Sequence, residues 1–241
     1  MSPVLASPRT RSNRRPATHR SPYSVDLVLL TVQEGQLVVA LTRPIVRGGS
    51  RGADRPRERW VLPWGMGRLE ETFEQSAERI ATETAGEPPA WLEQIGAFGD
   101  GRRHPGPTEI SVAFAGLIAA GTALPSDGDA SFFPVADLPA LAPRQRAMID
   151  AAVEMVQARV GQAPVAFRLL PPTFTLSELQ EMYELLLDRR LHKASFRRSL
   201  QAARIVEPTD EWRSEGRGRP AQLFRYAPRR RRNPPRGVRF E

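Results

Sequence analysis

The sequence predicts an α/β domain with a mixed sheet between helices, followed by a smaller domain made of helices and a hairpin. Within residues 24–43, two dense apolar runs rich in β-branched residues are typical of strands buried on both faces. Residues 60–86 read as a strand, a glycine loop and a helix, and further strands and a closing helix follow. Beyond a proline stop, residues 175–226 read as two helices and then two short strands.

The composition is that of a globular protein with an excess of positive charge. The chain has 241 residues, 40% hydrophobic and 26% charged, a length that suits one large or two ordinary domains. It has no cysteine, which excludes disulfides and thiolate metal sites. No apolar run approaches the ~20 residues that span a bilayer, and the N-terminus lacks a secretory signal, so we expect a cytoplasmic bacterial protein without membrane association. The net charge of +8 favours a polyanionic partner.

The N-terminal part is expected to be a basic arm followed by a hairpin and a loop. Residues 1–22 interleave proline and serine with arginine and offer little to bury, which predicts a disordered arm. Residues 24–43 read as a hairpin with a Glu-Gly pair at its turn. Arg43 ends the second strand and is expected to point toward the rim that carries the glycine loop. Residues 44–59 are polar and rich in glycine and arginine, and are expected to form a loop.

The organising stretch of the first domain is residues 60–86. We expect a short strand over residues 60–62, a loop containing Gly65, and a helix that begins at about Thr72. Thr72 and Gln75 have the spacing of a capping box. A strand, a flexible loop and a helix start can hold a pyrophosphate against backbone N–H groups.

The rest of the first domain is predicted to supply the other strands and the closing helix. Residues 91–100 read as a strand that enters a loop, residues 109–121 as a strongly apolar strand, and residues 131–135 as a short strand. A helix over residues 143–160 has proline in its first turn. Its predicted buried stripe is Ile149, Val153, Val156 and Val160.

The second domain has the pattern of a winged helix-turn-helix. Residues 163–172 end in Leu-Pro-Pro and are predicted to be a linker. A helix capped by Thr175, a basic helix over residues 191–203, and strands over residues 205–208 and 221–226 follow. In this motif the second helix lies in the major groove of DNA, and the hairpin, or wing, reaches phosphates or the minor groove.

The predicted DNA-binding residues lie on the exposed side of the basic helix and in the wing loop. Arginine paired with guanine is the commonest base contact, yet most protein–DNA hydrogen bonds go to phosphate. We therefore expect one or two of these residues to read bases and the others to position the domain; the alternative is a merely solvated basic face. The residues are Lys193, Ser195, Arg197, Arg198, Arg217 and Arg219.

The glycine loop and its helix resemble the Nudix box. In that family three carboxylates on one helix face hold the Mg²⁺ ions that activate water. Two of them are replaced here by Ile80 and Thr84, and one remaining carboxylate is a poor metal cage. The resemblance therefore predicts a nucleotide-binding pocket that needs no cofactor and has no catalytic residues or metal site. The positions in register with the family pattern are Gly65, Glu71, Arg79, Glu83 and Gly86.

The whole chain resembles the NrtR family, Nudix-related bacterial repressors of NAD metabolism genes. The resemblance rests on the degenerate box with its RLEET turn at residues 68–72, on LEQIGAFGD at residues 92–100, and on the linker with the winged helix. It implies a Nudix α/β/α sandwich over residues 23–162 and a winged helix domain over residues 163–228, with a disordered basic tail over residues 229–241. It also implies a homodimer that binds a palindromic operator in double-stranded DNA and senses ADP-ribose in the former hydrolase pocket.

The predicted effector-binding residues surround the box. Arg79 has two possible roles, pairing with the phosphates of the ligand or bracing the loop by pairing with Glu71. Trp64 stands where the family commonly has glycine, and it either stacks on an adenine or ribose or fills the loop. The full set is Arg43, Trp64, Gly65, Arg68, Arg79 and Glu83.

Two other function classes stay open. An active Nudix pyrophosphohydrolase of ADP-ribose or a similar nucleoside diphosphate derivative would release AMP in a reaction that depends on weakly held Mg²⁺. An RNA-processing factor would use the basic tails and would not prefer a palindromic duplex over single strands.

Overall fold

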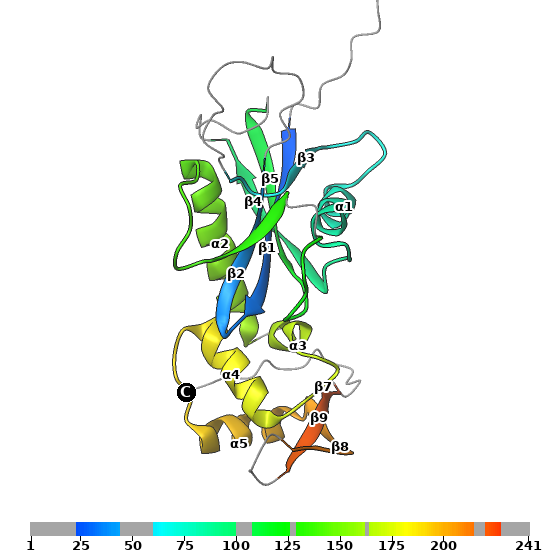
Figure 1. Ribbon diagram of the computed structural model, residues 1–241, viewed down its shortest axis with the longest axis vertical. Helices are drawn as coiled ribbons and strands as arrows, with labels where there is room; N and C mark the ends of the chain where they lie inside the picture. Colours follow the sequence, from blue (N-terminus) through cyan, green and yellow to red (C-terminus); the bar gives the residue numbers. More distant parts are fainter. Residues whose placement is uncertain are drawn as a thin grey trace, which may run out of the picture.

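The computed structural model of this chain describes residues 23–43, 60–99, 108–125, 129–161, 164–214 and 220–227. The predicted basic arm, the loop over residues 44–59 and the predicted basic tail lie outside these residues, as do Arg217 and Arg219. Two parts follow one another along the long axis of the molecule, a large sheet between two helices and then a smaller helical part with its own sheet (Figure 1). In the described part of the chain, no helix combines the length and the apolar character that crossing a bilayer requires.

A mixed six-stranded sheet forms the larger part, as the sequence predicts. Its strands are β1 (Tyr23–Gln33), β2 (Gln36–Thr42), β3 (Trp64–Met66), β4 (Trp91–Phe98), β5 (Ile110–Leu117) and β6 (Ala130–Pro134). The order is β4-β5-β1-β2-β6, with β1 parallel to β5 and antiparallel to β2. One edge of β1 is shared, because β3 pairs with its residues 24–26 and β2 pairs with its residues 30–33.

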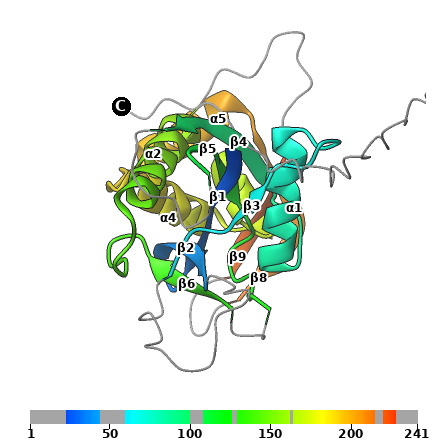
Figure 2. The same ribbon diagram turned by 90° about the horizontal axis from the view of Figure 1, so that it is seen from above.

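Two helices cover opposite faces of this sheet, α1 (Phe73–Ala85) and α2 (Pro143–Val160) (Figure 2). Successive residues of a strand point to opposite faces. Val28 and Leu30 accordingly belong to the apolar cluster that includes α2, whereas Leu27 and Leu29 belong to the cluster that includes α1. The predicted burial of β1 on both faces is therefore confirmed. In α2 the stripe also includes Met148 and Ala152, while the predicted Val153 is only half-buried.

Local signals placed α1 correctly but misplaced the strand before it. The backbone N–H of Gln75 donates to Thr72 Oγ1 at 3.2 Å, and the backbone N–H of Thr72 donates to Gln75 Oε1 at 2.8 Å, so the predicted capping box is present. Residues 60–62 make only an isolated bridge, between Val61 and Thr42, and the strand itself is β3. The apolar character of residues 60–62 reflects burial against the core, where Leu62 is fully buried.

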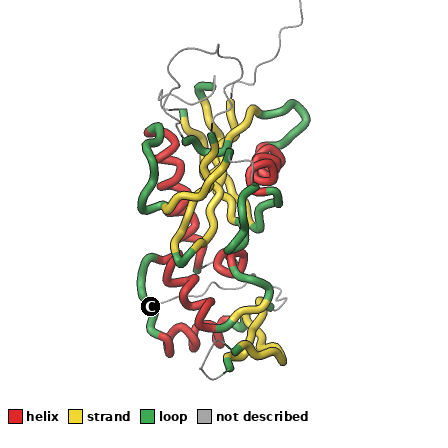
Figure 3. The backbone as a smooth tube through the Cα atoms, in the orientation of Figure 1, coloured by secondary structure: helices red, strands yellow, loops and turns green. Residues whose placement is uncertain are grey.

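The smaller part has the winged helix-turn-helix arrangement that the sequence predicts (Figure 3). Its elements are β7 (Thr173–Phe174), α4 (Leu176–Leu187), α5 (Lys193–Ala203), β8 (Val206–Arg213) and β9 (Ala221–Tyr226), with the sheet order β7-β9-β8. The strand predicted over residues 205–208 extends to Arg213, because a register shift after Pro208 lets pairing resume at Trp212. Proline lacks the N–H that a regular ladder needs, so the sequence pattern ended the strand too early.

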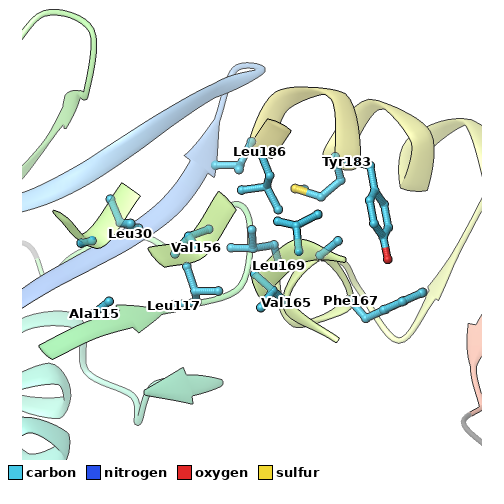
Figure 4. Packing of buried hydrophobic residues seen from close by; sticks show 14 of the residues in the cluster. Leu30, Ala115, Leu117, Val156, Val165, Phe167, Leu169, Tyr183 and Leu186 are labelled. Carbon is cyan, nitrogen blue, oxygen red and sulfur yellow. The ribbon is translucent and has the colours of Figure 1, made fainter. Parts of the chain in front are cut away.

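The segment predicted to be a linker contains a buried helix, α3 (Val165–Leu169). Figure 4 shows Val165 and Leu169 between Val156 of the larger part and Leu186 of the smaller part. One apolar cluster therefore runs through both parts, and α3 packs on both α2 and α4. A single five-residue helix is too short to show a helical period, which is why sequence reasoning assigned it to a linker.

Candidate effector site and nucleic-acid interface

The box loop is held by an ion pair between Glu71 and Arg79. Arg79 Nε donates to Glu71 Oε1 and Arg79 Nη2 donates to Glu71 Oε2, both at 2.9 Å. Ser76 Oγ also donates to Glu71 Oε2 at 2.9 Å, and Arg68 lies 3.2 Å from Glu71 Oε1. The hydrogen bond from Arg79, followed by that from Ser76, lowers the pKa of Glu71 to about 2 although burial opposes the shift. The bracing role that the sequence offered for Arg79 is therefore observed.

At two of the helix positions that hold metal in a Nudix hydrolase, the side chain here is buried and is not a carboxylate. Ile80 is 3% exposed and belongs to the apolar cluster under α1. Thr84 is buried and its Oγ1 donates to the carbonyl of Ile80 at 2.7 Å. Glu83 is exposed and lies 3.4 Å from Arg79 Nη1. A hard cation needs several oxygen ligands, and the described residues include no group of three or more His, Asp or Glu side chains that could hold one.

The predicted effector-binding residues lie on two sides of the sheet. Gly65 faces α1, because a Cβ placed on it would lie 3.3 Å from Ile80 Cδ1. Arg68, Arg79 and Glu83 belong to the loop and helix on that side. Trp64 pairs with Asp26 across the strands and so faces the α2 side, since paired residues share a face.

Arg43 also lies on the α2 side. Its guanidinium carbon is 5.0 Å from the centre of the Trp60 ring, a cation–π distance. Trp60 packs edge-on against Phe133, which belongs to the cluster around α2. Residue spacing predicted Arg43 at the rim that carries the glycine loop; its side chain lies on the α2 face of the sheet, as does that of Trp64, whereas Arg79 and Glu83 lie on the α1 side.

The predicted recognition helix α5 presents its basic residues to solvent. Phe196 and Leu200 are 1% exposed and anchor the helix in the core. The remaining face of the helix carries the predicted DNA-binding residues that the structure describes, all of them exposed: Lys193, Ser195, Arg197 and Arg198.

A groove of about 480 Å³ separates α5 from the wing. Arg197 lines it, together with Gln201 and Arg204, which sequence reasoning missed. The signal for Gln201 was available, because residues four positions apart lie on the same face of a helix, whereas Arg204 is the C-cap residue just beyond α5. The wing is fixed to α4 by Arg213, whose Nη1 donates to Glu178 Oε1 at 2.6 Å.

The smaller part matches a known family of DNA-binding domains. Residues 166–226 match the family described as the NrtR DNA-binding winged helix domain. The chain is 28% identical over 211 residues to the ADPR responsive transcriptional repressor NtrR of Acinetobacter baylyi, a match that covers 85% of this chain and 81% of that protein.

Solved structures show the same two-part arrangement. NrtR of Shewanella oneidensis in complex with a 27mer DNA superposes with a TM-score of 0.72 at 29% identity, covering 86% of this chain and 94% of that one. A second crystal structure of the same protein gives a TM-score of 0.72 at 28% identity, covering 86% of this chain and 95% of that one. A MutT/nudix family protein of Enterococcus faecalis shares the fold, with a TM-score of 0.64 at 19% identity over 87% and 89% of the chains.

Proposed function

This chain belongs to the NrtR family of Nudix-related transcriptional regulators, and we propose that it is a DNA-binding repressor whose operator affinity is set by an ADP-ribose-like effector. The observation that carries the proposal is the exposed basic face of α5 beside the wing, on a domain of the matched family. The Shewanella relative was solved in complex with a 27mer DNA, which supports DNA as the partner here.

The effector assignment rests on the box loop and on the relative that is named for its response to ADPR. The Glu71–Arg79 pair holds the loop in place, and Arg68 remains 61% exposed beside it to meet a phosphate. Ile80 and Thr84 provide no carboxylate for a metal, so a nucleoside diphosphate is held without being cleaved.

The family also supplies the biological setting. We propose a cytoplasmic homodimer that binds a palindromic operator, with its two winged helices about one DNA turn (~34 Å) apart. Its target genes belong to NAD or related metabolism.

Effector binding must favour one arrangement of the domains to change DNA affinity. The apolar cluster shared by α2, α3 and α4 gives a continuous packed connection between the effector domain and α5. The effector lowers operator affinity in this proposal, because bound ligand shifts that packing away from the arrangement that spans both half-sites.

A fluorescence polarisation titration with duplex DNA from the protein's own upstream region tests the proposal. We expect tight binding that weakens by about 5–150-fold when ADP-ribose is added, the usual range of allosteric coupling. An unchanged operator affinity at millimolar ADP-ribose would remove the sensor role. Release of AMP from ADP-ribose in the presence of Mg²⁺ would instead support a hydrolase.

A further inference from the structure

The interface between α2 and the sheet changes from apolar to polar along its length. Near the smaller part it is apolar, and Figure 4 shows Val156 of α2 beside Leu30 and Leu117 of the sheet. Toward the start of α2 the same stripe carries Gln145, which is 1% exposed. The same face of the sheet is polar at the start of β1 and β5, where Ser24, Asp26 and Ser111 precede the apolar residues of these strands.

The polar groups on the sheet side bond with one another. Ser24 Oγ donates to Asp26 Oδ2 at 2.7 Å and lies 3.1 Å from Ser111 Oγ. Thr108 Oγ1 donates to Ser24 Oγ at 3.2 Å. This network is buried, and the hydrogen bonds among its members replace the hydrogen bonds to water that burial removes.

The helix side of the interface differs. Within the described part of the chain, neither Nε2 nor Oε1 of Gln145 has a hydrogen-bond partner. Gln145 occupies the third position of α2, where a side-chain oxygen commonly accepts from the backbone N–H of the N-cap residue, yet Gln145 Oε1 accepts no such bond from Ala142. A buried amide with both a donor and an acceptor unused is rare in native proteins and points to a missing partner.

We propose that Gln145 reads the base of the effector, and that the start of α2, in addition to the box helix α1, is part of the effector site. This inference rests on the proposed response to ADP-ribose. A carboxamide pairs with the N6/N7 edge of adenine, because its oxygen accepts from the 6-amino group while its nitrogen donates to N7, and hypoxanthine presents two acceptors at the same positions. Trp64 lies on this face of the sheet, paired with Asp26, and supplies an aromatic surface for the base.

The position of Gln145 also explains how the signal reaches the DNA-binding domain. α1 packs mainly on strands of the sheet, whereas α2 packs on α3 and α4 as well. Because Gln145 is covered in the free protein, a base reaches its amide only when the start of α2 shifts. A shift at one end of a rigid helix moves its other end, where Val156 and Val160 pack into the shared cluster.

The test compares Gln145→Met with Gln157→Met, a half-buried glutamine near the other end of the same helix. Operator affinity is measured by polarisation with no ligand, with ADP-ribose, and with its hypoxanthine analogue, which carries oxygen in place of the 6-amino group. In the wild type and in Gln157→Met, we expect ADP-ribose to act at least 10-fold more strongly than the analogue. In Gln145→Met, we expect the two ligands to act equally and weakly.

Thermal unfolding gives a second readout that is independent of DNA. We expect the melting temperature of free Gln145→Met to equal or exceed that of the wild type, because two unpaired buried atoms are removed. The increase in melting temperature caused by ADP-ribose should be lost in the same variant. A structural role alone would lower the first value and leave the second unchanged.

The response to ADP-ribose and the role of Gln145 are tested separately by these measurements. If wild-type protein neither binds ADP-ribose nor responds to it, the proposed effector is wrong, and the assignment of Gln145 falls with it. If the wild type responds but Gln145→Met responds equally, with the same preference for the 6-amino group, the role of Gln145 alone is overturned.

Discussion

Arg79 holds both carboxylate oxygens of Glu71 across the first turns of α1, and the carboxylate joins the loop to the helix. A guanidinium matches a carboxylate in this two-point geometry, which fixes orientation as well as distance. In this chain the pair holds the box loop in place, although Ile80 and Thr84 replace the carboxylates at two of the metal-binding positions of the box.

Loss of the Glu71 charge should weaken the fold most at neutral pH. The pKa of Glu71 falls from 4.5 to about 2 in the folded protein, chiefly through the hydrogen bond from Arg79. The folded-state pKa lies below the unfolded value, so this carboxylate stabilises the fold above about pH 4.5, and its contribution is lost as the pH falls toward about 2. We expect Glu71→Gln to be less stable than the wild type in urea at about pH 7, and the difference to shrink between about pH 5 and pH 2.

Glu78→Gln is the matched control, since Glu78 is an exposed carboxylate on the same helix. Its stability should follow that of the wild type across the pH range. A Glu71→Gln curve parallel to the wild-type curve at all pH values would show that the pair with Arg79 does not stabilise the fold.

Restoring the lost glutamate at Ile80 should damage the fold without creating a hydrolase. The side chain lies in an apolar cluster and is 3% exposed, so a carboxylate there would be buried without a partner. We expect Ile80→Glu to lower the free energy of unfolding by about 3 kcal/mol or more, measured in urea. Thr82→Glu, at an exposed position of the same helix, should change it by less than about 0.5 kcal/mol. A stable Ile80→Glu protein that releases AMP with Mg²⁺ would contradict this account.

The salt dependence of operator binding should show whether Arg197 and Arg198 each contact a base or a phosphate. An arginine that reads a base contributes about 1–3 kcal/mol and its loss relaxes sequence preference. An arginine on a phosphate weakens binding to all sequences, and its loss reduces the slope of log K against log salt by about 1. We expect alanine at each position to weaken operator binding, and a polarisation titration at several salt concentrations to place each residue in one class. Arg146→Ala, on the exposed side of α2, should leave both affinity and slope unchanged.

Sequence reasoning succeeded where the signal was local and failed where it depended on packing. The capping boxes at Thr72 and Thr175 were readable because each motif spans four residues of one segment. The placement of Arg43 and Trp64 on one face of the sheet and of Gly65 on the other depends on packing, and residue spacing along the chain does not show it. The buried amide of Gln145 had no signal in the sequence either, since a glutamine in the first turn of a helix is common.

The aromatic contacts of Phe167 should carry the connection between the two parts of the molecule. Its ring lies 4.5 Å from that of Tyr226 and 6.3 Å from that of Tyr183, and so joins α3 to both β9 and α4. Phe167→Leu keeps most of the apolar volume but removes ring pairs worth about 1 kcal/mol, so the domain should stay folded. We expect the ratio of operator affinities without and with ADP-ribose to fall toward 1, while Phe133→Leu, in the same cluster but next to Trp60, keeps the wild-type ratio. Equal ratios in both variants would mean that the signal reaches α5 by a route that avoids α3.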